Sequence, residues 1–253
     1  LSKSEAKELK PNAAPSKYVN DAEISTKAAL LNVNKQINPS SKIGFTIDTY
    51  SKDSDIARAS GNLSTGYFNY TKQESDIKQT KNRYIFTWEH DAIDKTNFVD
   101  NLKAKIYYQD YETKDNWNEF QAQKFFYGSL LNQDRDVYSR YKLIDDSYGL
   151  DLQLGSNINN HKLTYGLDYS LTSNEYSQDK YTNTNGTISH TYFGTNYPIK
   201  RSPDTDTQRL GVYIQDEVDY GKTEFIYGLR FDNYQLNASA DSTYLDYCQV
   251  DSS

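Results

Sequence analysis

The feature that most constrains this chain is a period-two alternation of apolar and polar residues that recurs along most of its length. Alternation at this period places apolar side chains on one face of a β-strand and polar side chains on the other. In residues 162–171, Leu and Tyr alternate with Lys, Thr, Gly, Asp and Ser. Similar stretches occupy 29–33, 43–47, 84–88, 102–108, 148–154, 210–214 and 225–231. The pattern predicts an all-β, antiparallel structure with about eight strands.

The segments between these strands differ in length in a regular way. Short connections rich in Asn, Ser, Gly and Asp alternate with long ones along the chain. The short ones are 38–41, 94–96, 157–160 and 220–222, and the long ones are 53–81, 112–134 and 178–204. Many of the strands reach the roughly 9–11 residues that cross a bilayer, which is longer than typical soluble strands. Length and connections together predict a transmembrane β-barrel segment with short periplasmic turns and long extracellular loops.

The composition agrees with a thin apolar surface and excludes several other classes of protein. The chain is 36% hydrophobic, and it contains 24 Tyr among its aromatic residues, whereas disordered chains are poor in aromatics. No apolar run approaches the roughly 18–20 residues of a membrane helix. The single cysteine, Cys248, excludes an internal disulfide framework. A net charge of −7 argues against a nucleic-acid partner, because phosphate binding needs a basic face.

The two faces of the predicted strands have different expected surroundings. In a barrel, the apolar face contacts outer-membrane lipid and the polar face lines the lumen. The predicted luminal face carries charges of both signs, such as Lys105, Asp151, Asp168 and Arg230. The tyrosines suit aromatic girdles at the membrane interfaces, although Tyr also favours strands in general. The girdle candidates near strand ends are Tyr108, Tyr111, Tyr148, Tyr169, Tyr213 and Phe231.

Two hairpins resemble a known family. Residues 204–234, DTDTQRLGVYIQDEVDYGKTEFIYGLRFDNY, are similar to a recurring strand pair of TonB-dependent outer-membrane receptors. The segments SYGLDLQL and HKLTYGLDYS, at 147–154 and 161–170, resemble the hairpin before it. Within the superfamily, SPDTDTQRLGVYIQDEV is most similar to the haem, haemoglobin, transferrin and lactoferrin receptor branch. The resemblance implies a multi-pass protein of the bacterial outer membrane, with a barrel of about 22 strands around a plug.

The resemblance also implies a function and an organisation. We expect TonB-dependent uptake of haem, or of iron from a host protein such as haemoglobin, with the TonB complex acting through a plug absent from this chain. Haem would then be a transported ligand, and no resident cofactor or enzymatic activity is expected. Residues 1–22 are expected to form an irregular lead-in, and 23–253 part of the barrel, with the remaining strands absent. The branch's Phe-Arg-Ala-Pro and Asn-Pro-Asn-Leu boxes do not occur, so none of its ligand residues can be placed here.

Candidate ligand-binding residues come from the expected extracellular loops. His and Tyr are competent axial ligands of haem iron, and aromatic side chains are enriched in protein-binding hot spots. Solvated side chains, or loops that fold on one another and bury their rings, are the alternative interpretation. The candidates are Tyr67, Tyr70, Trp117, His190 and Tyr192. His90 and His161 lie beside short connections on the predicted periplasmic side, where capture of an external ligand is not expected.

Other functions remain open or lack support. A receptor of the same architecture for a siderophore or cobalamin is one alternative, and a self-contained small outer-membrane barrel acting as an adhesin is another. No Gly-x-Ser-x-Gly context or glycine-rich phosphate loop is present, so the sequence predicts no catalytic residue. The three histidines are too scattered for a His-x-x-x-His metal motif.

Overall fold

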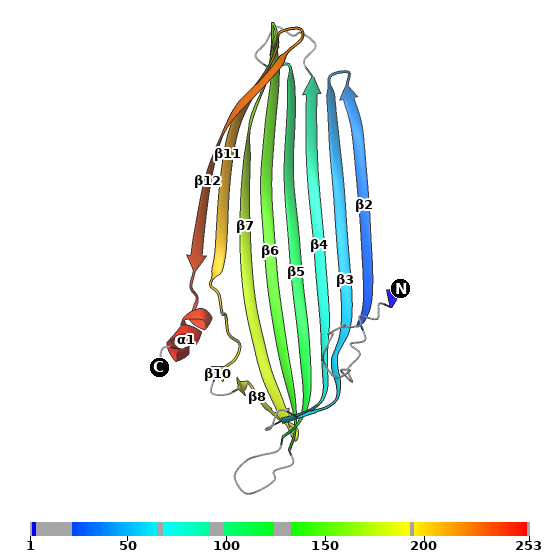
Figure 1. The fold of residues 1–253 in the computed structure, drawn as a ribbon, viewed down its shortest axis with the longest axis vertical. Helices are drawn as coiled ribbons and strands as arrows, with labels where there is room; N and C mark the ends of the chain where they lie inside the picture. The colour runs from blue at the N-terminus through cyan, green and yellow to red at the C-terminus, as the bar shows by residue number, and fades with distance from the viewer. Residues whose placement is uncertain are drawn as a thin grey trace.

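Eight long antiparallel strands dominate the computed structural model, which describes residues 2–3, 22–64, 68–91, 99–123, 133–192 and 195–251 (Figure 1). The long strands are β2 (Ala22–Asn38), β3 (Ser41–Ser64), β4 (Phe68–Asp91), β5 (Asn101–Gln123), β6 (Gln133–Ile158), β7 (His161–Thr184), β11 (Asp204–Asp219) and β12 (Glu224–Ser239). Shorter elements are β1 (Ser2–Lys3), β8 (Thr187–Ser189), β9 (Thr191–Tyr192), β10 (Thr195–Asn196) and helix α1 (Ser242–Asp251). The main sheet has the order β1-β2-β3-β4-β5-β6-β7-β11-β12, so the predicted architecture is confirmed.

The short connections lie together at one end of the sheet, at the top of Figure 1. Local hydrogen bonds define two of these turns: Ser40 N donates to Asn38 Oδ1 at 3.0 Å, and Gly221 N donates to Asp219 Oδ1 at 2.6 Å. Asn159 and Gly221 adopt positive φ angles of 57° and 80°, which turn-forming Asn and Gly tolerate. The predicted connections at 38–41, 157–160 and 220–222 are therefore confirmed, whereas 94–96 lies outside the described residues.

The expected long loops are largely wrong, because the strands continue through them. Strands β3 to β7 are each 23–26 residues long, far more than a bilayer requires. Strand β3 continues to Ser64, and β5 continues to Gln123. Among the described residues, the third connection keeps a non-strand segment after β7, interrupted by the short strands β8, β9 and β10. The strands thus extend as a sheet well beyond the apolar alternation.

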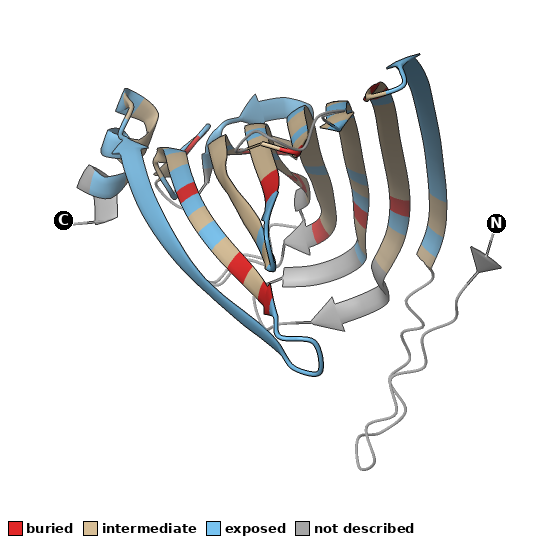
Figure 2. Ribbon diagram, turned by 90° about the horizontal axis from the view of Figure 1, so that it is seen from above, coloured by how far each residue is buried: buried red, intermediate tan, exposed pale blue. Residues whose placement is uncertain are grey.

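The register of the sheet places the apolar residues of neighbouring strands directly opposite one another. One such row crosses five strands through Phe45, Phe86, Ile106, Leu150 and Tyr169. Most of these rings and branched side chains are exposed; Ile106, for example, is 52% exposed. A contiguous apolar band on the surface is what a lipid-facing barrel wall requires. We call this side the outer face; the sheet that carries it is curved (Figure 2).

The opposite, inner face carries the predicted polar residues. Lys105 forms an ion pair with Asp151, and Arg230 contacts Asp168 at 2.6 Å. The predicted mixed-charge lining is therefore confirmed for these residues. Within the described structure, polar and apolar side chains separate by face and no thick apolar core forms, since Val137, Ile199 and Val218 are the hydrophobic residues buried there.

Glycines on the inner face make room for side chains from the next strand. A Cβ at Gly149 would overlap the Tyr107 ring, and one at Gly166 would overlap the backbone oxygen of Leu152 and lie 2.7 Å from the Tyr213 hydroxyl. Tyr107 is directly opposite Gly149, and Tyr213 is directly opposite Gly166. The absence of a side chain at these glycines therefore allows aromatic rings to lie close to the wall.

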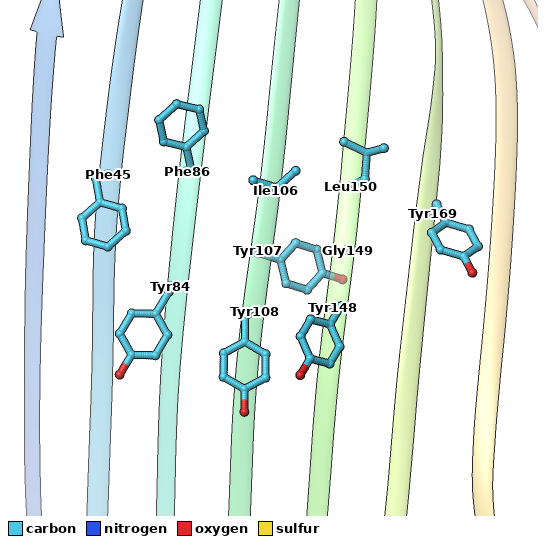
Figure 3. A pocket seen from close by; sticks show the side chains of 10 residues that line it. All are labelled: Phe45, Tyr84, Phe86, Ile106, Tyr107, Tyr108, Tyr148, Gly149, Leu150 and Tyr169. Carbon is cyan, nitrogen blue, oxygen red and sulfur yellow. The ribbon is translucent and has the colours of Figure 1, made fainter.

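Tyrosines mark the limit of the apolar band that is farther from the short connections, as a membrane girdle would. The rings of Tyr84 and Tyr108 are stacked with centroids 6.3 Å apart, and those of Tyr108 and Tyr148 are 4.8 Å apart. Figure 3 shows all three hydroxyls pointing the same way along the strands. The girdle prediction was wrong for Tyr111, whose hydroxyl accepts a hydrogen bond from Gln79 on the inner face, and for Tyr213.

Helix α1 follows β12 and is fixed at its start. Asp241 Oδ1 accepts a hydrogen bond from Tyr244 N at 2.9 Å, which caps the helix. Lys200 contacts both Asp204 and Asp241 at 2.6 Å and links the helix to the start of β11. These two carboxylates raise the pKa of the Lys200 ammonium above its usual range. No helix among the described residues has the length and apolar character needed to cross a membrane.

Candidate functional site

The best-formed group of ligand-competent side chains lies on the outer face, near the ends of β6 and β7 that are away from the short connections. Tyr138 lies directly opposite Tyr181, and Arg140 directly opposite Asp179, in the ladder between these strands. His190, which follows β8, contacts both Tyr181 and Asp179. We call these five residues the tyrosine–histidine cluster.

Aromatic stacking organises the cluster. The Tyr138 and Tyr181 rings are stacked with centroids 4.8 Å apart and an interplanar angle of 16°. The His190 ring lies 5.6 Å from that of Tyr181 and is tilted by 42°. The Arg140 guanidinium carbon is 5.4 Å from the Tyr138 centroid and 5.9 Å from that of Tyr181. This places one cation against the paired rings at cation–π distance.

Polar contacts hold Arg140 and His190 in place. Arg140 Nη1 donates to Asn118 Oδ1 at 2.8 Å. His190 Nδ1 lies 3.4 Å from Asp179 Oδ1, and within the described part of the chain Nε2 has no hydrogen-bond partner. The His190 side chain is 55% exposed. Burial, and then the Asp136 carboxylate, raise the pKa of Tyr138, so its phenol stays neutral at physiological pH.

A local turn explains why His190 reaches β7. Asn185 and Gly186 both have positive φ angles, 51° and 85°, and Asn-Gly is the preferred pair for a two-residue hairpin turn. Gly186 N donates to Asn183 Oδ1 at 2.9 Å. The turn folds β8 back on β7, so that Thr187 lies opposite Thr184 and Ser189 opposite Thr182. His190 follows immediately and therefore lies beside the β7 side chains.

The rest of the third connection is also attached to β7. Backbone hydrogen bonds join Gln178 and Ile199 in both directions, at 3.0 and 2.8 Å, and both residues are buried. Tyr197 N donates to the His190 carbonyl at 2.9 Å. The backbone around His190 is thus supported from both sides.

The structure separates the predicted site residues. His190 lies in the third connection as expected, but Trp117 lies within β5, on the inner face, between Ser75 and Ser139 of the neighbouring strands. These two candidates are therefore on opposite faces and cannot share one small site. Tyr70 lies in β4 and Tyr192 in β9, but their side chains lie outside the described residues, as does Tyr67 entirely.

The inner face at this height is much less accessible than the cluster. Ser75, Ser139, Gln178 and Thr182 are buried there. Burial also lowers the pKa of Lys180, which lies opposite Ser139. The accessible ligand-competent groups at this end of β6 and β7 are therefore those of the tyrosine–histidine cluster.

Sequence reasoning missed Tyr138, Arg140 and Tyr181: Tyr181 lies in the expected long loop 178–204, and Tyr138 and Arg140 lie in 135–147, between an expected loop and an expected strand. Polar residues occupy both faces there, so alternation gave no signal. The Asn185-Gly186 pair was an available signal, since it predicts a hairpin that brings residues after it back onto the preceding strand.

The cluster offers aromatic, ionic and metal-ligating groups to a flat ligand. Tyrosine rings offer stacking surfaces, the guanidinium pairs with carboxylates, and an imidazole nitrogen can ligate a metal centre carried by the ligand. No group of three or more His, Cys, Asp or Glu side chains among the described residues is arranged to hold a metal ion by itself.

Comparison with known proteins identifies the family but no individual relative. The family model described as TonB dependent receptor-like, beta-barrel, matches residues 20–248. No curated protein matches the chain. The matched family consists of outer-membrane receptors that transport external ligands with the help of TonB. With its long strands, apolar outer face and polar inner face, the chain belongs to the TonB-dependent receptor β-barrel family.

Proposed function

We propose that this chain forms barrel wall and part of the capture surface of a receptor for haem, or for iron carried by a host protein such as haemoglobin. The observation that supports the proposal is the tyrosine–histidine cluster, where an exposed imidazole lies 5.6 Å from one of two stacked phenol rings. Imidazole is an established axial ligand of haem iron, and phenol rings provide flat contact surfaces for a macrocycle. Arg140 supplies a cation for a ligand carboxylate.

The proposed transport cycle uses the family's general mechanism. The extracellular ends of the strands and the third connection bind the ligand, and the TonB complex then acts on the receptor's plug. The ligand passes through a lumen lined by polar groups such as Lys105, Asp151 and Arg230. This chain would contribute wall and capture surface, with no catalytic residue.

Replacement of His190 by Ala in the full-length receptor tests the proposal. We expect haem affinity to fall at least tenfold, on the order of the loss of one metal–ligand bond or a few hydrogen bonds, with a changed Soret band in the bound state. His90→Ala is the matched control, because His90 contacts Ser41 at the opposite, short-turn end of the sheet. Its affinity is expected to stay within twofold of the wild-type value.

Whole-cell competition separates haem from other ligands. Growth on haem or haemoglobin as iron source should fall in His190→Ala cells while growth on ferric siderophore is unchanged. Equal haem affinity of the His190→Ala and wild-type receptors would contradict the proposal, and so would displacement of the natural ligand by cobalamin or siderophore but not by haem. Deletion of all of 178–204 is unsuitable, because it removes the buried Gln178–Ile199 bridge.

A further inference from the structure

We propose that Asn185 is a site of spontaneous deamidation, that the Asn183 side chain slows this reaction, and that the isoaspartate product detaches β8 and His190 from β7. Three features combine: an exposed Asn-Gly pair, a hydrogen bond on the nitrogen that would react, and a short strand whose pairing depends on the turn. The modification is separate from ligand capture and does not depend on which ligand the receptor transports.

The sequence contains one Asn-Gly pair, Asn185-Gly186, and both residues are exposed. In such a pair the main-chain nitrogen of glycine can attack the side-chain carbonyl carbon of asparagine, because glycine has no Cβ to obstruct the approach. A Cβ at Gly186 would have no neighbouring heavy atom within 4 Å in the described structure. The turn lies beside β8, at the lower end of the sheet in Figure 1. Solvent can therefore supply both the base and the water that the reaction uses.

The reaction needs only water as its co-reactant. The nitrogen of Gly186 gives its proton to a solvent base and forms a bond with Cγ of Asn185, and the Cγ–Nδ2 bond breaks with loss of ammonia. The product is a five-membered succinimide ring. Water then opens the ring: cleavage at Cγ leaves aspartate, and cleavage at the main-chain carbonyl carbon leaves isoaspartate, in which the backbone runs through the side chain. In sum, one water is consumed and one ammonia is released, with no oxidation or reduction.

The hydrogen bond from Asn183 opposes the first step. Gly186 N donates to Asn183 Oδ1 at 2.9 Å. Once deprotonated, this nitrogen would face the lone pairs of the same oxygen, so the contact favours the protonated, unreactive amide. Removal of the Asn183 side-chain amide should therefore make Gly186 N a better nucleophile.

The turn conformation opposes the second step. The φ angles of Asn185 and Gly186, 51° and 85°, are those of a type I′ turn. The succinimide ring includes the Cα–C bond of Asn185, so its closure fixes the rotation about that bond at a value that this turn does not have. The folded turn thus protects Asn185, and the reaction proceeds when the turn opens.

The turn between β6 and β7 is an internal reference. Asn159 has a φ angle of 57°, and Asn159 and Asn160 together join Ile158 to His161, which are directly opposite each other. The residue after the first asparagine is here Asn160, whose Nδ2 donates to the backbone oxygen of Asp219 at 3.1 Å. A similar turn therefore has a side chain where Gly186 has none. Asn159 should deamidate much more slowly than Asn185.

The attachment of β8 depends on the length of the turn. Its pairing with β7 consists of three residue pairs, and its own three residues are all exposed. Isoaspartate adds one backbone atom to a turn of only two residues, so Thr187 can no longer lie opposite Thr184 with the same geometry. His190 follows β8 and would lose its ring contact with Tyr181. Aspartate keeps the ordinary backbone, and Asp-Gly suits the same turn, so the isoaspartate product alone should detach β8.

Ageing of the full-length receptor in detergent tests the reaction. The receptor is incubated at physiological temperature and pH, and peptide mass spectrometry counts the amides that have become acids and separates aspartate from isoaspartate. We expect conversion at Asn185 to be at least about tenfold faster than at Asn159, a comparison that needs no variant. Asn183→Ala should speed it about fivefold, the size expected for loss of one hydrogen bond. Asn183→Asp keeps an acceptor oxygen and should react no faster than the wild type.

Hydrogen exchange of residues 187–189 tests the consequence. Molecules with isoaspartate at 185 should exchange these amides at least about tenfold faster than unmodified molecules, because detached strands lose their backbone hydrogen bonds. Freshly purified Asn185→Asp is the matched control and should exchange within about twofold of the wild type. Equal conversion at Asn185 and Asn159, equal rates in Asn183→Ala and the wild type, or unchanged exchange in the isoaspartate fraction would overturn the proposal. None of these measurements involves haem, so their outcome is independent of the receptor test.

Discussion

The membrane-level and extracellular parts of the same strands follow different rules. At membrane level in β5, apolar and polar side chains alternate strictly from Leu102 to Lys105, and the outer face remains apolar to Tyr108. Further along, Glu112 and Lys114 lie on the outer face, and Thr113 and Asp115 on the inner face, so both faces are polar. The ladder between β5 and β6 nevertheless runs without a register shift from Asn101 to Gln123. Alternation of apolar and polar side chains is therefore required where lipid covers one face. Beyond the lipid, backbone pairing alone continues the strand.

The two parts are also stabilised by different contacts. At membrane level, the inner face depends on close fit, as where Tyr107 covers Gly149. At the extracellular end, polar cross-strand pairs predominate, such as Ser75 with Asp115 at 2.5 Å and Gln73 with Glu119 at 3.3 Å. Substitutions should therefore cost more at membrane level, where steric overlap cannot be relieved by water.

The largest effect is expected for Gly166→Ala. Its Cβ would overlap the Leu152 carbonyl oxygen, a backbone atom within the sheet that cannot move aside. Overpacking of this kind costs about 1–3 kcal/mol or more. Urea unfolding of the receptor in lipid should show the loss, and Tyr213→Ala should not restore stability, because the backbone clash remains. Recovery in that double variant would show that the ring alone fills the space.

Gly149→Ala should cost somewhat less and be rescuable. Here the overlap is with the Tyr107 ring, a side chain, so removal of the ring removes the clash. A double-mutant cycle of Gly149→Ala with Tyr107→Ala should give a coupling energy of about 1 kcal/mol or more in favour of the pair. Additive losses would mean that the two positions do not share one volume.

A smaller effect is expected at the extracellular end, in the tyrosine–histidine cluster. Arg140→Gln removes the cation from the faces of Tyr138 and Tyr181. Its coupling with Tyr181→Leu should be about 0.5–1 kcal/mol, the usual size of an exposed cation–π contact. The same unfolding measurement checks it. A coupling larger than that of the Gly149 and Tyr107 pair would reverse the contrast between the two regions.

The smallest expected effect is a pH dependence at Glu112. Hydrogen bonding to Lys114 lowers the pKa of Glu112 below its ordinary value of 4.5. The folded state therefore favours the ionised carboxylate, and its stabilising contribution is present above the ordinary value and lost as pH falls through the lowered one. The total should be under about 1 kcal/mol, because these ion pairs are partly solvated. Stability measured between pH 7 and pH 3 should lose this component in Glu112→Gln; an unchanged pH profile would contradict it.

The contrast between regions explains how much of the fold could be predicted. The eight long strands and three of the short turns followed from alternation and turn residues, as in 162–171 and at Asn159. The strand extensions did not, because residues such as Glu112, Lys114 and Asn116 have low strand preference and no apolar partner face. Their conformation is imposed by the neighbouring strands, which a local pattern cannot show.

Of the residues in the candidate site, only His190 was predicted from the sequence. His190 was identified from the sequence as a residue able to ligate haem iron. Its partners Tyr181 and Asp179 lie in β7, and the Asn185-Gly186 turn brings His190 back beside them. Arg140 and Tyr138 lie in β6, and the register pairs them with β7 residues that are 39 and 43 positions away in sequence. Trp117 was expected near the same ligand. Side chains of β5 alternate between the two faces, however, and Trp117 lies on the inner face. Face assignment in the extracellular part requires the register, which the sequence does not reveal where both faces are polar.

The glycine and tyrosine pairs of the inner face limit which substitutions can be accepted during evolution. The Tyr107 ring occupies the space that a side chain at position 149 would need. The Tyr213 ring occupies part of the space that a side chain at position 166 would need. A lineage that acquires a side chain at position 149 must therefore lose bulk at position 107. The two positions should change together among homologous chains, whereas position 166, limited by backbone, should stay glycine whatever residue occupies position 213.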